Sequence, residues 1–254
     1  MAHVAYELEQ RLERDSGVTN EVLLSDVRWI LELLGDREGI LSDDQQKGLV
    51  GELVFLRKLL IHGRERLVPP SAVIEHWHGF DRAKRDFSGP GVAVEVKTTS
   101  NDSRVHQVGS LAQLEPQGNE DVFLFSLGIK LDSSAPKKLP DFVADVMDLL
   151  VLTEGGPDYD LQTKISEKLE IYGYQRGRES LYRSCPGFLS FHLQPKLFRE
   201  RELDRVRLTS FKGDTLPTMV VDVSYRLDVR SPELSAIDEV DVLRKLLGLP
   251  AEGK

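Results

Sequence analysis

Residues 92–97, with the sequence VAVEVK, restrict the fold of the chain more than any other stretch. Successive side chains of a β-strand point to opposite faces, so the three valines share one face and Ala93, Glu95 and Lys97 share the other. The valine face needs an apolar layer to cover it, which predicts a strand packed under helices in an α/β protein. The opposite face places a carboxylate and an ammonium group side by side.

A second carboxylate, Asp86, precedes this strand and lies just before a Ser-Gly-Pro-Gly turn. We expect the turn to bring Asp86 to the same end of the sheet as Glu95 and Lys97. Two carboxylates beside a lysine suit Mg²⁺-dependent hydrolysis of a phosphodiester. Carboxylate oxygens hold the ion, while the lysine can orient the attacking water and offset charge in the transition state. The alternative interpretation is an ordinary surface ion pair on a strand.

A helix over residues 43–61 is expected ahead of this strand, because Ser42 and Gln45 have the spacing of a capping box. Its leucines recur at helical spacing and form one apolar stripe. Glu52 lies at the edge of that stripe, where its carboxylate can point along the sheet surface. Gly48 and Gly51 flank it, and each glycine inside a helix costs about 1 kcal/mol relative to alanine, which indicates close approach of a backbone or ligand. The alternative is an ordinary glutamate at a helix boundary.

The chain divides into three predicted regions around these residues. Residues 1–42 form a helical segment, since Leu23, Val27, Ile30 and Leu34 recur at helical spacing. Residues 43–131 form a mixed α/β module, and residues 132–254 form an α+β region. The expected elements after the first helix are strands over 72–77, 86–87 and 92–98, a helix over 108–114, a strand over 122–131, helices over 141–152 and 159–171, strands over 187–193 and 218–229, and a helix over 238–247.

Composition narrows the class of protein. The formal net charge is −9, which argues against a protein that coats DNA through bulk charge but leaves room for a local basic track. The single cysteine, Cys185, forms no internal disulfide and suits a reducing compartment. No apolar run approaches the roughly 18 residues of a membrane span, and the first residues lack the features of a secretory signal. These features predict a cytoplasmic protein without a membrane partner.

Asp86 and the Glu95-x-Lys97 pair, following a helix that carries Glu52, resemble the PD-(D/E)XK superfamily of restriction-endonuclease-like proteins. The expected order of elements over 43–131 is similar to the αβββαβ core of that superfamily. More narrowly, residues 48–53, 86–87, 95–99 and 110–114 together resemble a bacterial PD-(D/E)XK family associated with restriction or phage-defence genes. Arg85 stands where the named motif has proline, and Asp81 is a competing candidate for the first aspartate.

The resemblance implies a Mg²⁺-dependent endonuclease that hydrolyses DNA phosphodiester bonds, with Mn²⁺ able to substitute. Asp86 and Glu95 would be the metal ligands, and Lys97 would lie beside the attacking water. Glu52 would be an auxiliary acid, and Gln113 matches an active-site glutamine of related nucleases. The implied setting is bacterial restriction or phage defence, with a homodimer or an ATPase or helicase as partner. The alternatives are a non-catalytic nucleic-acid-binding or scaffolding subunit and a structural protein with a chance motif.

Basic residues gather in two stretches that could contact nucleic-acid phosphates. The first would form a rim around the site, and the second mixes arginine with tyrosine. An ordinary solvated face is the alternative for both. The candidate contacts are Arg57, Lys58, Arg82, Lys84 and Arg85 in the first stretch and Arg176 and Arg178 in the second.

Overall fold

The computed structural model describes residues 40–79, 85–132, 134–152, 156–185, 187–230 and 236–250. The chain divides into two units, residues 1–40 and 41–254, and the elements of the fold belong to the second unit. The helix predicted within residues 1–42 therefore lies almost wholly outside the described residues. So do Asp81, Arg82 and Lys84.

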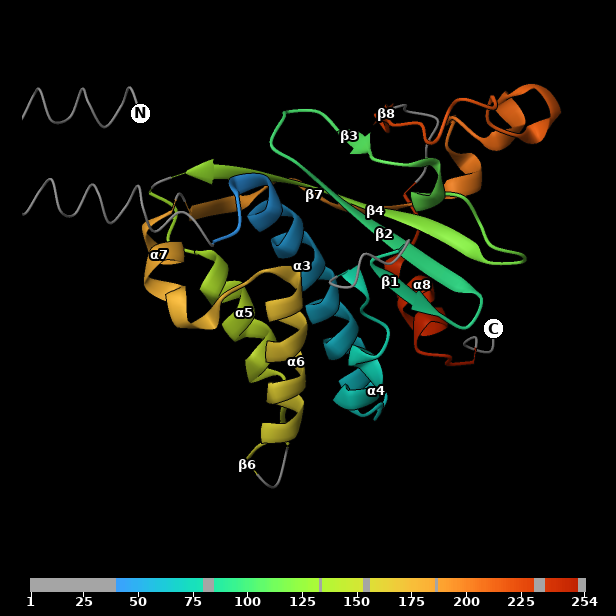
Figure 1. Cartoon of the computed structure of the whole chain (residues 1–254). Helices are drawn as coiled ribbons and strands as arrows, with labels where there is room; N and C mark the ends of the chain where they lie inside the picture. The colour runs from blue at the N-terminus through green and yellow to red at the C-terminus, as the bar shows by residue number, and fades with distance from the viewer. Residues whose placement is uncertain are drawn as a thin grey trace, which may run out of the picture. The chain divides into compact units, whose positions relative to one another are not determined.

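A four-stranded mixed sheet forms the centre of the fold (Figure 1). Its strands are β1 (Phe87–Gly89), β2 (Val92–Thr99), β4 (Asp121–Asp132) and β7 (Gly187–Arg199), in the order β1-β2-β4-β7. β2 runs parallel to β4, while β1 and β7 are antiparallel to their neighbours. The α/β class predicted from the sequence is confirmed. Because β7 pairs with β4, the sheet includes a strand from beyond residue 131.

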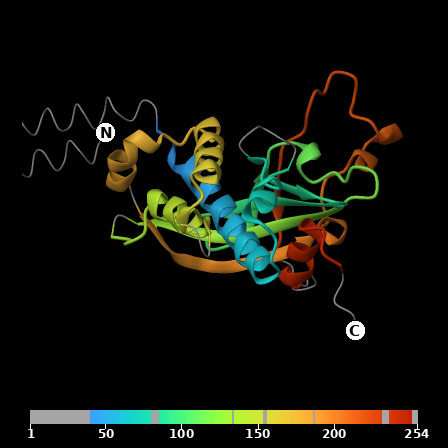
Figure 2. The same cartoon turned by 90° about the horizontal axis from the view of Figure 1, so that it is seen from below.

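Helices cover the valine face of β2 (Figures 1 and 2). The main one is α3 (Asp43–Glu65), which begins with the predicted capping box at Ser42. Gly51 brings this helix close to β2, because a Cβ atom at Gly51 would collide with the Thr98 side chain. Farther along α3, Phe55 packs edge-on against Phe87 and Phe125, at centroid distances of 4.7 and 4.9 Å.

The other face of the sheet is covered by a small antiparallel pair of strands, β3 (Val105–Val108) and β8 (Tyr225–Asp228). A short 3₁₀ helix, η2 (Leu111–Gln113), follows β3. The apolar side chains between this layer and the sheet form a second core, made of Val108, Leu114, Val122, Leu124, Phe198, Leu203, Leu227 and Val229. The sheet therefore lies between two layers of different kinds.

None of the helices in the described ranges combines the length and the apolar character that a membrane span needs.

The remaining elements surround these layers. The remaining elements are α4 (Pro70–Ile74), α5 (Leu139–Asp148), β5 (Val151–Leu152), β6 (Gly156–Pro157), α6 (Tyr159–Tyr172), η3 (Arg176–Arg178), α7 (Glu179–Ser184), η4 (Glu200–Glu202), η5 (Leu208–Ser210), η6 (Lys212–Asp214) and α8 (Glu239–Leu246).

Four predicted elements differ from the structure. The helix expected over 141–152 ends at Asp148, and Val151 and Leu152 form β5 instead. The strand expected over 72–77 is helix α4, because Pro70 occupies the first helical turn, where its missing N–H is not needed. The helix expected over 108–114 forms only as the short 3₁₀ helix η2, and Val108 instead ends β3, which pairs with β8 far along the chain. Of the strand expected over 218–229, only Tyr225–Asp228 forms.

Candidate active site

Glu95 and Lys97 lie next to each other on the face of β2 that points away from α3. The Lys97 Nζ atom is 2.8 Å from Glu95 Oε1, and the Glu95 residue is only 2% exposed. Lys97 Nζ also donates to Gln113 Oε1 at 3.2 Å. That oxygen accepts a second bond from the Gly109 N–H at 2.7 Å, which fixes the Gln113 side chain. Direct contacts through Lys97 therefore join three of the predicted site residues, Glu95, Lys97 and Gln113.

Asp86 joins this group through the edge of β2. Pairing between β1 and β2 ends at Phe87 and Val94, so β1 does not reach the backbone N–H of Val96. The Asp86 Oδ2 atom accepts from this N–H at 2.7 Å. The carboxylate thus extends the hydrogen bonding of the sheet edge and lies close enough to Glu95 to influence its ionisation.

Glu52 brings a third carboxyl group to the site from α3. Trp77 Nε1 donates to Glu52 Oε2 at 2.7 Å, and the Tyr172 hydroxyl at the end of α6 donates a second hydrogen bond. Gly79 is required beside it, because a Cβ atom there would collide with the Glu52 carboxylate. Sequence reasoning missed the roles of Trp77 and Tyr172, since no local pattern indicates that α6 packs against this glutamate.

Burial raises the pKa of all three carboxyl groups, and repulsion from neighbouring carboxylates raises it further for Glu52 and Glu95. For Glu95 the pKa rises to about 8, because burial and the negative charge of Asp86 outweigh the attraction of Lys97. The pKa of Glu52 is raised well above its usual range by burial, then by Asp86 and Glu95. Burial also raises the pKa of Asp86, opposed by the Val96 N–H and by Lys97. Such a cluster of perturbed acids is typical of functional sites.

The family of the chain agrees with this geometry. A family model described as "Putative PD-(D/E)XK family member, (DUF4420)" matches residues 3–230. The chain belongs to this family. The resemblance to PD-(D/E)XK proteins predicted from the residues around the site is confirmed, and the family match also includes most of the C-terminal region. Neither a curated protein nor a solved structure matches the chain.

The carboxylates of this PD-(D/E)XK family member fit a hydrated divalent cation. Within the described residues, no group of three or more His, Cys, Asp or Glu side chains is arranged to hold a metal. Mg²⁺, however, usually keeps several waters and is held by one or two carboxylates together with substrate phosphate. Asp86 and Glu95 supply such a pair, and a cation between them would relieve the repulsion that raises the pKa of Glu95.

Most of the residues predicted to contact phosphate contact other protein groups instead. Arg85 is 5% exposed and donates to the backbone carbonyls of Ala112 and Glu115, so it braces η2 and does not face solvent. This burial does not fit its predicted contact with phosphate. The other described residues are Arg57, 3.9 Å from Asp145; Lys58, 2.6 Å from Glu239; Arg176, exposed and 3.3 Å from the Ser166 hydroxyl; and Arg178, half-buried.

Proposed function

We propose that this chain is a Mg²⁺-dependent nuclease that hydrolyses DNA phosphodiester bonds, with Mn²⁺ able to replace Mg²⁺. The observation that carries the proposal is the meeting of Asp86 and Glu95 beside Lys97 in a member of the PD-(D/E)XK family. A structural ion pair alone needs only one of these acids. A second, half-buried carboxylate beside the first destabilises the site unless a cation or substrate compensates for its charge.

The side chains divide the proposed reaction between them. Asp86 and Glu95 would hold the cation, which when bound polarises the scissile phosphate and lowers the pKa of a water. Lys97 Nζ has three N–H groups, of which Glu95 and Gln113 accept two. The third can orient the attacking water or contact a phosphate oxygen whose charge grows in the transition state. Gln113 holds Lys97 in this position.

Glu52 acts as the auxiliary acid of the proposed site. Its carboxyl group is fixed by Trp77 and Tyr172, and the charge on Asp86 influences its pKa. Binding of a cation to Asp86 and Glu95 therefore lowers the pKa of Glu52 as well, since positive charge favours the ionised form. The ionisation of Glu52 would therefore depend on whether a cation is bound to Asp86 and Glu95.

A cleavage assay tests the proposal. Supercoiled, linear and single-stranded DNA would be incubated with the protein in Mg²⁺, Mn²⁺ or EDTA. We expect cleavage in both metals, no cleavage in EDTA, and a loss of about 100-fold or more in Asp86→Asn and Lys97→Met. Lys212→Met is the matched control, because Lys212 is exposed on η6. Cleavage that persists in both site variants would refute the assignment of the site.

A non-catalytic nucleic-acid-binding or scaffolding subunit is the second candidate, favoured by the net charge of −9. An acidic chain attracts a polyanionic substrate poorly without help. This candidate predicts DNA binding, alone or with an added ATPase or helicase partner, that Lys97→Met leaves unchanged, and no cleavage under any condition.

The proposed biological setting is bacterial restriction or phage defence, with DNA as the partner. A homodimer would place two such sites on opposite strands and allow double-strand cleavage. Analytical ultracentrifugation with and without a short duplex tests the dimer, and protection of cells against phage by wild type but not by Asp86→Asn tests the setting.

A further inference from the structure

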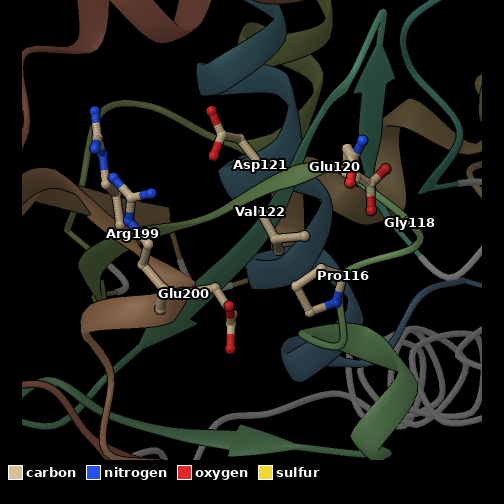
Figure 3. Close-up of a pocket in the computed structure, with 9 residues that line it drawn as sticks. Pro116, Gly118, Glu120, Asp121, Val122, Arg199 and Glu200 are labelled. Carbon is tan, nitrogen blue, oxygen red and sulfur yellow. The ribbon is translucent and has the colours of Figure 1, made fainter.

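A cavity of about 320 Å³ lies at the end of the sheet where β4 begins and β7 ends (Figure 3). Its walls come from the segment that leads into β4 and from residues 199–201. It is separate from the candidate active site. Because Val122 lines the cavity and Glu95 pairs with Leu124, the cavity begins two residues along the sheet from Glu95, or about 7 Å.

The acidic side chains of this cavity are already neutralised. Three carboxylates line it, and each contacts a cation that lies outside the lining. These contacts are Glu120 with Arg85 at 3.8 Å, Asp121 with Lys245 at 2.8 Å, and Glu200 with Arg205 at 2.5 Å and Arg207 at 2.9 Å. The carboxylates therefore contribute little net negative charge to the cavity.

The two arginines of the lining differ from these carboxylates in their contacts with the described residues. Among the described residues, neither Arg199 nor Arg201 has a carboxylate within 4.0 Å, although both lower the pKa of Asp121 at longer range. The Arg199 Nε atom is buried, and no hydrogen-bond acceptor contacts it among the described residues. The Arg199 guanidinium lies 6.0 Å from the centroid of the Phe123 ring, which restricts its position. Without a carboxylate partner among the described residues, the guanidinium groups of Arg199 and Arg201 give this end of the sheet positive charge that an anionic ligand can offset.

We propose that this cavity binds a phosphorylated organic ligand, with the phosphate held by Arg199 and Arg201. Phosphate oxygens match the planar fork of a guanidinium group and can accept two N–H bonds from it. The volume exceeds that of a bare anion and lies at the lower end of small-molecule sites. The volume left beside the phosphate gives room for an organic group bonded to it.

The ligand can be a free mononucleotide-sized molecule or one phosphate of a nucleic-acid chain, since both present the same group. The site does not depend on the proposed nuclease activity, because none of the side chains that line it belongs to the candidate active site. The inference therefore stands or fails separately from the cleavage assay.

Isothermal titration calorimetry in EDTA tests the inference, with inorganic phosphate, adenosine 5′-monophosphate and adenosine as probes. We expect the nucleotide to bind, phosphate to bind more weakly and adenosine not to bind. Arg199→Gln and Arg201→Gln should each weaken nucleotide binding about tenfold or more, because each removes charge-assisted hydrogen bonds. Arg226→Gln is the matched control, since Arg226 is exposed on β8 and outside the cavity lining. Lys97→Met should bind the nucleotide as well as wild type does.

The variants also distinguish the two sources of phosphate. If a single-stranded oligonucleotide binds more weakly to Arg201→Gln and the slope of log affinity against log salt falls by about one, the phosphate belongs to a nucleic acid. If only the mononucleotide is affected, the ligand is a free molecule. The proposal is overturned if neither phosphate nor the nucleotide binds, or if both cavity variants bind like Arg226→Gln. Because Arg201 is exposed, its variant separates lost binding from a folding defect.

Discussion

Replacing Glu95 by glutamine should stabilise the metal-free protein while it disables the proposed site. The pKa of Glu95 is about 8 in the folded chain against 4.5 for an ordinary glutamate. Between these values the native state binds more protons than the unfolded state, so the free energy of unfolding decreases as the pH rises from 4.5 to 8. At pH 7 the loss amounts to about 3 kcal/mol, and it is complete above pH 8.

Glu95→Gln removes this loss, because the amide is neutral at every pH and has a similar size. Part of the gain is offset, since Lys97 loses its ionic partner while only 17% of its side chain is exposed to water. We therefore expect the variant to be about 1 to 3 kcal/mol more stable than wild type at pH 8.5 and about equal to it or less stable at pH 5. Repulsion on Asp86 and Glu52 also decreases, which acts in the same direction.

Urea denaturation in EDTA at pH 5, 7 and 8.5, followed by circular dichroism, measures the difference. Glu167→Gln on α6 is the control, because Glu167 is exposed and should show no gain. Added Mg²⁺ at pH 8.5 should stabilise wild type and leave Glu95→Gln nearly unchanged. If the difference between Glu95→Gln and wild type is the same at all three pH values, the reasoning about the buried carboxylate is refuted.

Three further substitutions test a buried hydrogen bond, a close helix–strand contact and the ionisation of a buried histidine. Trp77→Phe should cost about 1 to 3 kcal/mol in urea denaturation, because the buried Glu52 carboxyl group loses a donor; no change would show that the 2.7 Å bond contributes nothing. Gly51→Ala should lower the melting temperature. Overpacking against β2 costs about 1 to 3 kcal/mol, which exceeds the roughly 1 kcal/mol that alanine gains over glycine inside a helix. Gly177→Ala is the control and should be neutral, because a Cβ atom at Gly177 would meet no neighbouring atom. Burial lowers the pKa of His106 from 6.5 to about 4, so between these pH values the unfolded state binds a proton that the folded state does not. The free energy of unfolding should therefore fall by about 3 kcal/mol from pH 7 to pH 4. His106→Asn should remove this part of the pH dependence, and the same dependence of stability on pH in both proteins would contradict the reasoning.

The parts of the site that could be predicted from the sequence depend on short-range patterns. The alternation in β2 determines that Glu95 and Lys97 share a face, and the capping box determines where α3 begins. The strand predicted over 122–131 is confirmed as β4, whose residues 122–129 are all buried. Each of these signals lies within one element, so no knowledge of distant contacts was needed.

The parts that were missed depend on contacts between distant segments. Val108 was predicted to begin a helix, and the pairing of β3 with β8 places it in a strand instead. Tyr172 reaches Glu52 from α6, and nothing in either helix alone indicates this contact. The burial of Arg85 was also unpredictable, since its acceptors are the backbone carbonyls of Ala112 in η2 and of Glu115 after it, in a segment distant from Arg85 in the sequence.

The fourth strand of the sheet has a consequence for synthesis of the chain on the ribosome. All the proposed site residues up to Gln113 leave the ribosome before β7, which ends at Arg199. Until β7 has emerged, β4 has one unpaired edge lined by apolar side chains, a surface that invites pairing with other nascent chains. A completed site therefore arises only near the end of translation, and a fragment that stops at residue 131 should aggregate instead of cutting DNA.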